Sequence, residues 1–321
     1  MKLLVTGGAG FIGSCFIRQM LGKGYKIINL DALTYAGNIE NLDDVKDNPD
    51  YQFVRGNICD KELVPQLVEQ VDAVVNFAAE SHVDRSITGP EIFIDTNVKG
   101  TLNLLQAAKQ ANVQRYLQVS TDEVYGSLGK DGYFYETTPL APNSPYSASK
   151  ASADMLVRAY FETYGLPVLT TRCSNNYGPY QYPEKLIPYF ISQLLKGEKV
   201  PVYGDGLNVR DWLYVYDHCS AIETVLTKGK PGGVYNIGGN NEKTNMEITR
   251  LILAAMGKDE TSIRYVEDRL GHDRRYAICN DKICRELGWE PSITFEQGIK
   301  LTIDWYLNNQ DWIESIEQKR L

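Results

Sequence analysis

The chain has 321 residues, of which 43% are hydrophobic and 23% charged, a composition typical of a globular protein and far from that of a disordered one. This length fits one large domain or two coupled domains. The formal net charge of −8 argues against nucleic acid or an anionic membrane as the main partner, because both require a basic surface.

The first half of the chain alternates short apolar runs with helical patterns. A strand at 2–6 leads through a glycine turn into an amphipathic helix at about 11–21. The other predicted strands are 25–31, 51–56, 72–79, 115–121 and 166–172, and the other predicted helices are 61–70, 90–111 and 146–164. Such alternation predicts an α/β fold of the Rossmann type, a doubly wound parallel sheet covered by helices on both faces.

The alternation fades after about residue 175, where glycine and proline become frequent. Short helical patterns follow at 245–257, 281–287 and 295–308. We therefore expect residues 1–174 to form mainly the sheet domain and residues 175–321 mainly a smaller, mixed α/β region that binds a ligand, with chain crossovers between them. Five arginines are concentrated in this second region of an acidic chain: Arg264, Arg269, Arg274, Arg275 and Arg285.

The glycine turn after the first strand has the GxGxxG pattern of a dinucleotide site, with Gly10 and Gly13 as its last two glycines and Gly7 just before it. Glycines there permit a tight turn, close approach of a pyrophosphate and close helix packing. Asp31 follows 18 residues after Gly13, at the end of the second strand, where its carboxylate can bind a ribose and repel a 2′-phosphate. The pattern predicts NAD; the alternative is a glycine turn with Asp31 as a helix cap.

Tyr146 and Lys150 are four residues apart, which places them on one face of a predicted helix. A tyrosine is a poor base at its ordinary pKa of about 10. We expect the Lys150 ammonium to favour the phenolate and to lower the pKa of Tyr146. The alternative is a packed tyrosine beside a solvated lysine.

Thr121, Asp122 and Glu123 directly follow residues 115–120 at the end of a predicted strand, and the carboxyl ends of parallel strands line the ligand crevice. Two adjacent carboxyl groups can serve as acid and base when their surroundings separate their pKa values. The alternative is a strand end with an aspartate that caps a helix.

The cysteines and histidines show no metal-site spacing, so we expect no bound metal. Scattered cysteines in a long chain are typical of reduced thiols, and we expect a cytoplasmic protein. We expect packing or hydrogen bonding, not catalysis, for His82 and His272. No run approaches about 18 apolar residues, and the glycine-rich start is not a signal peptide, so we expect no membrane partner.

Taken together, these motifs resemble the extended short-chain dehydrogenase/reductase family and, within it, the dTDP-glucose 4,6-dehydratases. The resemblance extends over about residues 3–306. Its most specific parts are "GGAGFIG", "STDEVYG", "SPYSASKASAD", "RCSNNYGPYQYPEKLIP" and "DRLGHDRRYAI".

The resemblance implies catalytic roles at the matching positions. Tyr146 would take the proton of the sugar 4-hydroxyl while hydride leaves carbon 4 for NAD. Glu123 would remove the proton on carbon 5, and protonated Asp122 would donate to the departing 6-hydroxyl. Thr121 would hydrogen-bond the 4-oxygen, and Lys150 would also hold the nicotinamide ribose.

The resemblance also implies the binding residues. The NAD site would be lined by Gly7, Gly10, Phe11, Ile12, Gly13, Asp31, Thr34, Asn57, Ile58, Ala78, Ala79, Thr96, Tyr146, Lys150 and Asn176. The nucleotide-sugar would be held by Ser81, Thr121, Asn175, Lys185, Leu186, Pro201, Tyr203, Arg210, Asn245, Arg275 and Tyr276. Arginine and lysine suit a pyrophosphate. The alternative for Arg210 is an ion pair with Asp205 or Asp211, and for Arg275 one with Asp273.

Two positions depart from the family pattern: Asn57 replaces the usual aspartate, and Cys279 follows "AI" where aspartate is usual. We expect an altered adenine contact at Asn57 without loss of NAD. The resemblance favours dTDP-glucose over a uracil nucleotide and a homodimer formed through helices 90–111 and 146–164. The alternatives are a UDP-glucose 4,6-dehydratase, a 4-epimerase, a decarboxylase or a non-enzymatic NAD-binding module.

Overall fold

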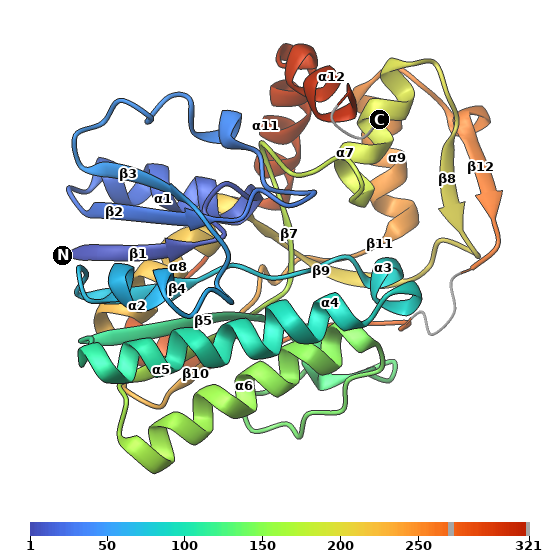
Figure 1. Cartoon of the computed structure of the whole chain (residues 1–321). Helices are drawn as coiled ribbons and strands as arrows, with labels where there is room; N and C mark the ends of the chain where they lie inside the picture. Colours follow the sequence, from blue (N-terminus) through green and yellow to red (C-terminus); the bar gives the residue numbers. More distant parts are fainter. Residues whose placement is uncertain (269–272, 319–321) are drawn as a thin grey trace.

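The computed structural model describes residues 1–268 and 273–318. A central sheet of seven parallel strands carries a smaller region beside its carboxyl edge (Figure 1). The order of the strands is β10-β6-β5-β4-β1-β2-β3. Their bounds are β1 (Lys2–Thr6), β2 (Lys26–Asp31), β3 (Tyr51–Arg55), β4 (Ala73–Asn76), β5 (Arg115–Thr121), β6 (Val168–Cys173) and β10 (Val234–Ile237). The predicted doubly wound parallel sheet is confirmed.

Helices cover both faces of the central sheet. One face packs on α1 (Phe11–Gly22), α8 (Val215–Lys228) and α10 (Asp281–Leu287), with a core that includes Phe16, Leu117 and Ile222. The other face packs on α2 (Leu63–Val68), α5 (Thr101–Ala111) and α6 (Pro145–Tyr164), around Leu4 and Tyr116. The buried strands can therefore be apolar on both sides, as their sequences are.

One predicted helix differs in the structure, and several elements after residue 175 were not predicted, among them one strand of the central sheet. The helix predicted over 90–111 consists of α4 (Glu91–Phe93), a π-helical segment η2 (Ile94–Gly100) and α5. The seventh strand, β10, was not predicted, because glycines on both sides of this four-residue run suggest a loop. It pairs with β6, so the chain returns to the central sheet after building part of the smaller region.

The smaller region contains two short sheets and several helices. One sheet consists of β7 (Asn175–Tyr177), β9 (Val209–Tyr214) and β11 (Glu242–Thr244), and the other of β8 (Val200–Tyr203) and β12 (Ile263–Val266). The helices are α7 (Leu186–Leu195), α9 (Asn245–Ala255), α11 (Phe295–Asn308) and α12 (Gln310–Gln318). They enclose a second core, centred on Tyr177, Ile191 and Phe295. The short helix α3 (Val83–Thr88) and the 3-10 turns η1 (Ile39–Leu42), η3 (Asp122–Tyr125) and η4 (Glu260–Ser262) lie in the connections.

Helix α6 is defined at both ends by its sequence. Ser144 and Ser147 form a capping box, Pro145 occupies the first turn, and Gly165 ends the helix in the left-handed conformation. Inside the protein, Asp154 of α6 accepts a 2.9 Å hydrogen bond from Arg172 Nε of β6. Both side chains are almost fully buried, so each charge depends on the other.

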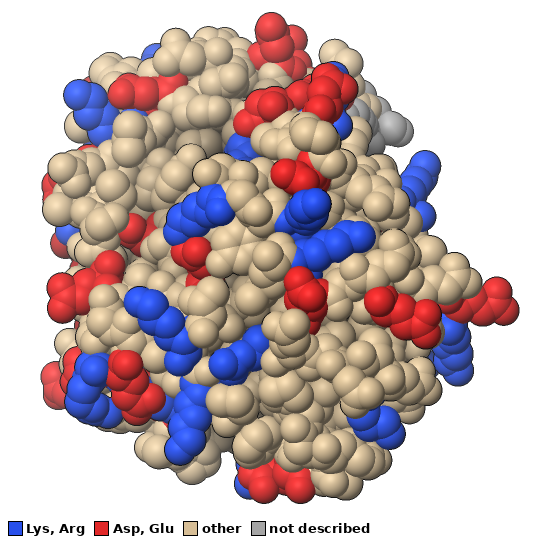
Figure 2. Space-filling model, turned by 90° about the vertical axis from the view of Figure 1, so that its left-hand side faces the viewer, with Lys and Arg blue, Asp and Glu red and all other residues tan. Residues whose placement is uncertain are grey.

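The surface seen in Figure 2 carries Lys and Arg side chains interspersed with Asp and Glu. Mixed charge of this kind does not form the continuous basic surface that nucleic acid requires. Among the described helices, none has the length and apolar character needed to cross a membrane. The described part of the chain also holds no cluster of three or more His, Cys, Asp or Glu side chains suited to a metal ion.

We predict that Asp154→Ala lowers the free energy of unfolding by about 3–5 kcal/mol, because it leaves the Arg172 charge buried without its partner. The matched control on the same helix is Arg158→Ala, which breaks an exposed pair with Glu162 and should change stability by less than about 0.5 kcal/mol. Denaturant titration of both variants measures the difference. Equal losses of stability in the two variants would show that the buried Asp154–Arg172 pair stabilises the protein no more than the exposed pair does.

Candidate active site

Two adjoining cavities lie at the carboxyl edge of the central sheet, where α/β proteins bind their ligands. The first, of about 330 Å³, lies along the glycine turn, and the second, of about 470 Å³, lies between the sheet and the smaller region. The two cavities meet at six described residues that line both: Glu123, Asn175, Asn176, Gln181, Glu184 and Lys185. Every residue predicted to bind the cofactor lines the first cavity.

The glycine turn is packed too closely for side chains. Gly7 has a φ of +69°, and a Cβ there would lie 2.6 Å from the Ala78 nitrogen. A Cβ on Gly13 would lie 2.3 Å from the Gly7 oxygen. Helix α1 begins directly after Gly10 without a side-chain cap, so its first amide groups face the cavity as donors for a phosphate.

Asp31 lies at the end of β2, almost fully buried, and each of its carboxylate oxygens accepts one backbone hydrogen bond. Ala9 N donates to Oδ2 and Leu33 N donates to Oδ1, both at 2.8 Å. Each oxygen keeps a lone pair for a ribose hydroxyl. The glycine cradle and this carboxylate fit NAD, with the pyrophosphate at the start of α1 and the adenosine ribose at Asp31.

We predict that Gly13→Ala weakens NAD binding at least tenfold, because the added Cβ collides with the backbone of Gly7. Gly22→Ala is the matched control, since a Cβ at this end of the same helix meets no atom within 4 Å. Titration of the purified, cofactor-stripped variants with NAD gives both affinities. Unchanged affinity in Gly13→Ala would mean that the cradle does not hold the cofactor.

Tyr146 and Lys150 project from α6 into the first cavity, and both are buried. Lys150 Nζ donates a 2.8 Å hydrogen bond to the Val119 carbonyl oxygen of β5. Burial raises the pKa of Tyr146 well above its ordinary value, and the negative charge of Glu123 raises it further. Burial also lowers the pKa of Lys150. The expectation that the Lys150 ammonium lowers the pKa of Tyr146 below its ordinary value is therefore wrong.

Asp122 begins the turn η3 at the end of β5, and only 3% of it is exposed. Burial raises the pKa of this carboxyl well above its ordinary value, and the charges of Glu123 and Asp211 add to the effect. Its Oδ1 accepts a 3.3 Å hydrogen bond from Thr121 Oγ1, whereas Oδ2 is buried with no partner among the described residues. A protonated Asp122 thus has a hydrogen to donate, and no described residue accepts it at Oδ2.

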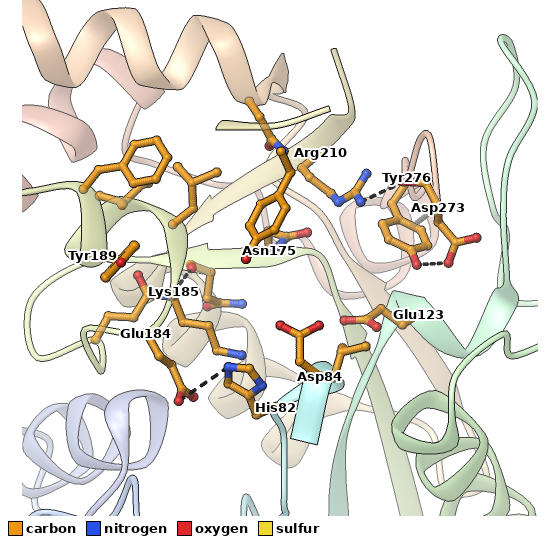
Figure 3. Close-up of a pocket in the computed structure, with 18 of the residues that line it drawn as sticks. His82, Asp84, Glu123, Asn175, Glu184, Lys185, Tyr189, Arg210, Asp273 and Tyr276 are labelled. Atoms are coloured by element: carbon orange, nitrogen blue, oxygen red, sulfur yellow. Dashed lines mark hydrogen bonds and ion pairs between the residues drawn. The ribbon is translucent and has the colours of Figure 1, made fainter. Parts of the chain in front are cut away.

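The second cavity carries positive groups on opposite walls. Figure 3 shows His82, Glu184 and Lys185 on one side and Arg210, Asp273 and Tyr276 on the other. Lys185 Nζ donates to the Ser81 carbonyl oxygen at 3.3 Å. Arg210 donates to the carbonyl oxygens of Val209 and Asp273 and lies 4.5 Å from the centre of the Tyr276 ring. Its predicted ion pairs are not formed in the described residues, since Asp205 pairs with Arg274 and Asp211 accepts from Gly239 and Asn241.

Of the residues predicted to bind the nucleotide-sugar, Ser81 and Thr121 line the first cavity. Asn175, Lys185, Leu186, Pro201, Tyr203, Arg210, Asn245 and Tyr276 line the second. Arg275 lines neither, because its guanidinium is engaged by both carboxylate oxygens of Glu242, at 2.7 and 2.9 Å. The placement of Arg275 at the pyrophosphate is therefore not supported, and neither is its alternative pair with Asp273.

His82 and His218 have structural positions. His82 Nδ1 accepts from the Arg85 amide and caps α3, as expected of a hydrogen-bonding histidine. His218 is fully buried, and burial lowers its pKa to about 3, so the ring is neutral. Its Nδ1 lies 2.9 Å from Asn176 Oδ1 and orients that amide at the junction of the cavities. His272 and Arg269 lie outside the described residues.

Several side chains that line the cavities were not predicted from the sequence. Tyr35 and Glu80 line the first cavity, and Gln181 and Glu184 line both. Asp273, named only as an alternative partner of Arg275, lines the second. Glu184 precedes Lys185 within a quoted motif, and Tyr35 follows Thr34, so proximity to predicted residues was the available signal.

Comparison with known proteins agrees with this geometry. The model of the GDP-mannose 4,6 dehydratase family matches residues 4–302. The dTDP-glucose 4,6-dehydratase of Xanthomonas campestris pv. campestris (strain B100) is 58% identical over 98% of this chain and 95% of that protein. The dTDP-glucose 4,6-dehydratase DesIV of Streptomyces venezuelae, crystallised with NAD bound, has a TM-score of 0.97 and 53% identity, over 98% of this chain and 100% of that one.

An epimerase with the same fold is more distant in sequence. The UDP-glucose 4-epimerase of Thermotoga maritima has a TM-score of 0.90 and 32% identity, over 97% of this chain and 100% of that chain. The fold is therefore shared among several sugar-nucleotide activities, and the side chains of the site must distinguish them.

Proposed function

The chain belongs to the GDP-mannose 4,6 dehydratase family, and we infer that it converts dTDP-glucose to dTDP-4-keto-6-deoxyglucose with NAD as its cofactor. The reaction oxidises carbon 4, eliminates water across carbons 5 and 6, and returns hydride to carbon 6. Water is the only product released besides the sugar nucleotide, so the enzyme is a hydro-lyase.

The proposed chemistry begins at Tyr146. When bound, NAD accepts and later returns the hydride, and it brings a positive charge into the cavity that Tyr146 lines. This charge and the Lys150 ammonium favour the phenolate, which removes the proton of the 4-hydroxyl. Thr121, at the end of β5, donates a hydrogen bond to the 4-oxygen.

The carboxyl groups of η3 then carry out the elimination. The new ketone at carbon 4 acidifies the hydrogen on carbon 5, and Glu123 removes it as a proton. Asp122, kept protonated by its burial, donates its proton to the 6-hydroxyl, which leaves as water. Lys185 and Arg210 hold the pyrophosphate from opposite walls of the second cavity.

One observation carries this proposal: Asp122 and Glu123 stand beside Tyr146 and Lys150 on the wall of a single cavity. A 4-epimerase needs only the tyrosine and the cofactor, and a decarboxylase needs no acid to expel a 6-hydroxyl. An NAD-binding module without activity needs none of the four. A buried acid next to a base is expected where water is eliminated.

We predict that Tyr146→Phe lowers turnover by about 10²- to 10⁴-fold, because no group then removes the 4-hydroxyl proton. Glu123→Gln should oxidise carbon 4 and stop, so that reduced NAD accumulates on the enzyme. Ultraviolet absorbance of reduced NAD and NMR of the sugar distinguish a variant that fails to oxidise carbon 4 from one that fails to eliminate water. Normal product formation by Glu123→Gln would remove this residue from the elimination.

The raised pKa of Asp122 has a consequence for pH. A donor must be protonated, so the rate of water loss should fall as the pH rises through that raised pKa. Asp122→Asn has no such proton and should be slower by about 10²-fold or more, without this alkaline limb. Single-turnover measurement of water loss against pH tests both statements. An alkaline limb that persists in Asp122→Asn belongs to another group.

We also propose a cytoplasmic homodimer. All six cysteines are free thiols, which supports a reducing compartment. Helix α6 contacts both α3 and α4. These helices and the start of η2 carry four large apolar side chains that are between 44% and 50% exposed: Ile87, Ile92, Ile94 and Met155. Exposed apolar side chains on adjoining helices are suited to contact with a second copy.

A further inference from the structure

Helix α12 follows α11 in the smaller region (Figure 1), but its side chains bond to the turn η1, which follows the wall of the cofactor cavity. Trp312 Nε1 donates a 2.9 Å hydrogen bond to Asn41 Oδ1 of η1, and Ser315 Oγ donates to Glu40 Oε2 at 2.9 Å. The buried side chains Ile313 and Ile316 fix the same helix to the protein interior. Helix α12 thus has two hydrogen bonds to a single turn about 270 residues earlier in the chain.

Asn41 connects helix α12 to the glycine turn. It is 2% exposed, and its Nδ2 donates a 2.9 Å hydrogen bond to the Ala9 carbonyl oxygen. The amide of the same Ala9 donates to Asp31 Oδ2 at 2.8 Å. A continuous series of hydrogen bonds therefore runs from Trp312 through Asn41 and Ala9 to the carboxylate that suits the ribose.

The segment between β2 and η1 lines the cofactor cavity. Ala32, Thr34, Tyr35, Ala36 and Gly37 belong to the cavity wall, and η1 follows immediately. This segment has no strand or helix of its own, so its position depends on its contacts. Asp31 in the β-sheet fixes one end, and the Tyr35 ring packs on Arg85 and Tyr182 in the middle. At the other end the Asn38 amide and the Asn41 side chain both donate to the Ala9 carbonyl oxygen.

The opposite side of α12 contacts helix α7, which begins at the second cavity. Glu317 accepts a 2.9 Å hydrogen bond from Ser192 Oγ of α7, the helix that begins next to Lys185. Trp312 also packs 5.2 Å from Trp305 and 5.8 Å from Tyr180, measured between ring centres, and the Arg18 guanidinium lies over the Tyr180 ring. The helix is thereby held in place from both halves of the molecule.

We propose that α12 retains the cofactor: Trp312 positions Asn41 and so keeps the segment 32–42 closed against the adenosine end of the NAD cavity. The inference rests on the proposed use of NAD. No residue of α12 lines either cavity, so Trp312 is a positioning residue. Loss of its hydrogen bond should act on the release of NAD and leave the chemical steps unchanged.

The test is the rate at which the purified holoenzyme releases NAD, measured by exchange with an excess of labelled NAD. Trp312→Phe keeps the aromatic packing and removes the N–H, and we expect release about twofold to tenfold faster, as for the loss of one hydrogen bond. The turnover number at saturating NAD should not change. Glu314→Gln, an exposed change on the same helix, is the matched control and should release NAD at the wild-type rate.

Two further variants keep the proposal testable if Trp312→Phe folds poorly. Ser315→Ala removes the bond to Glu40 with little change in packing, and Asn41→Asp keeps an acceptor for Trp312 but loses the donor to Ala9. Faster release in both supports the proposal. Wild-type release in Trp312→Phe and Ser315→Ala, even with a lower melting temperature, would overturn it, as would faster release in Asn41→Asp alone.

These outcomes are separate from failure of the proposed function. A protein that holds NAD but does not dehydrate dTDP-glucose still allows the release rate to be measured. A protein that binds no NAD contradicts the proposed function before α12 is tested.

Discussion

The exclusion of water from one end of the cofactor cavity governs the chemistry of this site. Asp122, Tyr146 and Lys150 are all buried there, and burial disfavours the charged form of each group. For Asp122 this is an advantage, because an acid must keep its proton. For Tyr146 it is an obstacle, because a base must lose one, and added positive charge has to compensate. Oxidation therefore requires bound cofactor, whereas elimination uses a carboxyl that is already protonated.

The backbone places these groups before any ligand binds. Strand β5 leads into η3 with Asp122 and Glu123, and the capped helix α6 presents Tyr146 and Lys150 one turn apart. Tyr125, the last residue of η3, donates to Asn236 of β10 at 2.7 Å and accepts from Arg172 at 2.9 Å. Because Arg172 also holds Asp154 of α6, one buried network fixes the acid–base turn relative to the tyrosine helix.

The sequence predicts the parts of this arrangement that depend on local pattern. Continuous apolar strands, the glycine spacing and the Tyr146–Lys150 interval identify the sheet, the cofactor cradle and one helix face. Other features depend on contacts between distant residues. The four residues of β10 form a strand because they pair with the edge of β6. Arg275 does not line the cavity because it forms an ion pair with Glu242, thirty-three positions away. The raised pKa of Tyr146 likewise reflects burial in the folded chain, which the spacing to Lys150 does not reveal.

The most direct measurement is incubation of the purified protein with dTDP-glucose in deuterated water without added cofactor, followed by NMR of the sugar. The account predicts a 4-keto-6-deoxy product with solvent deuterium at carbon 5, formed with the NAD that the protein retains. Turnover only after addition of NAD would still support dehydration but show weak retention. Formation of the galactose epimer, or no reaction even with added NAD, would contradict the roles assigned to Asp122 and Glu123.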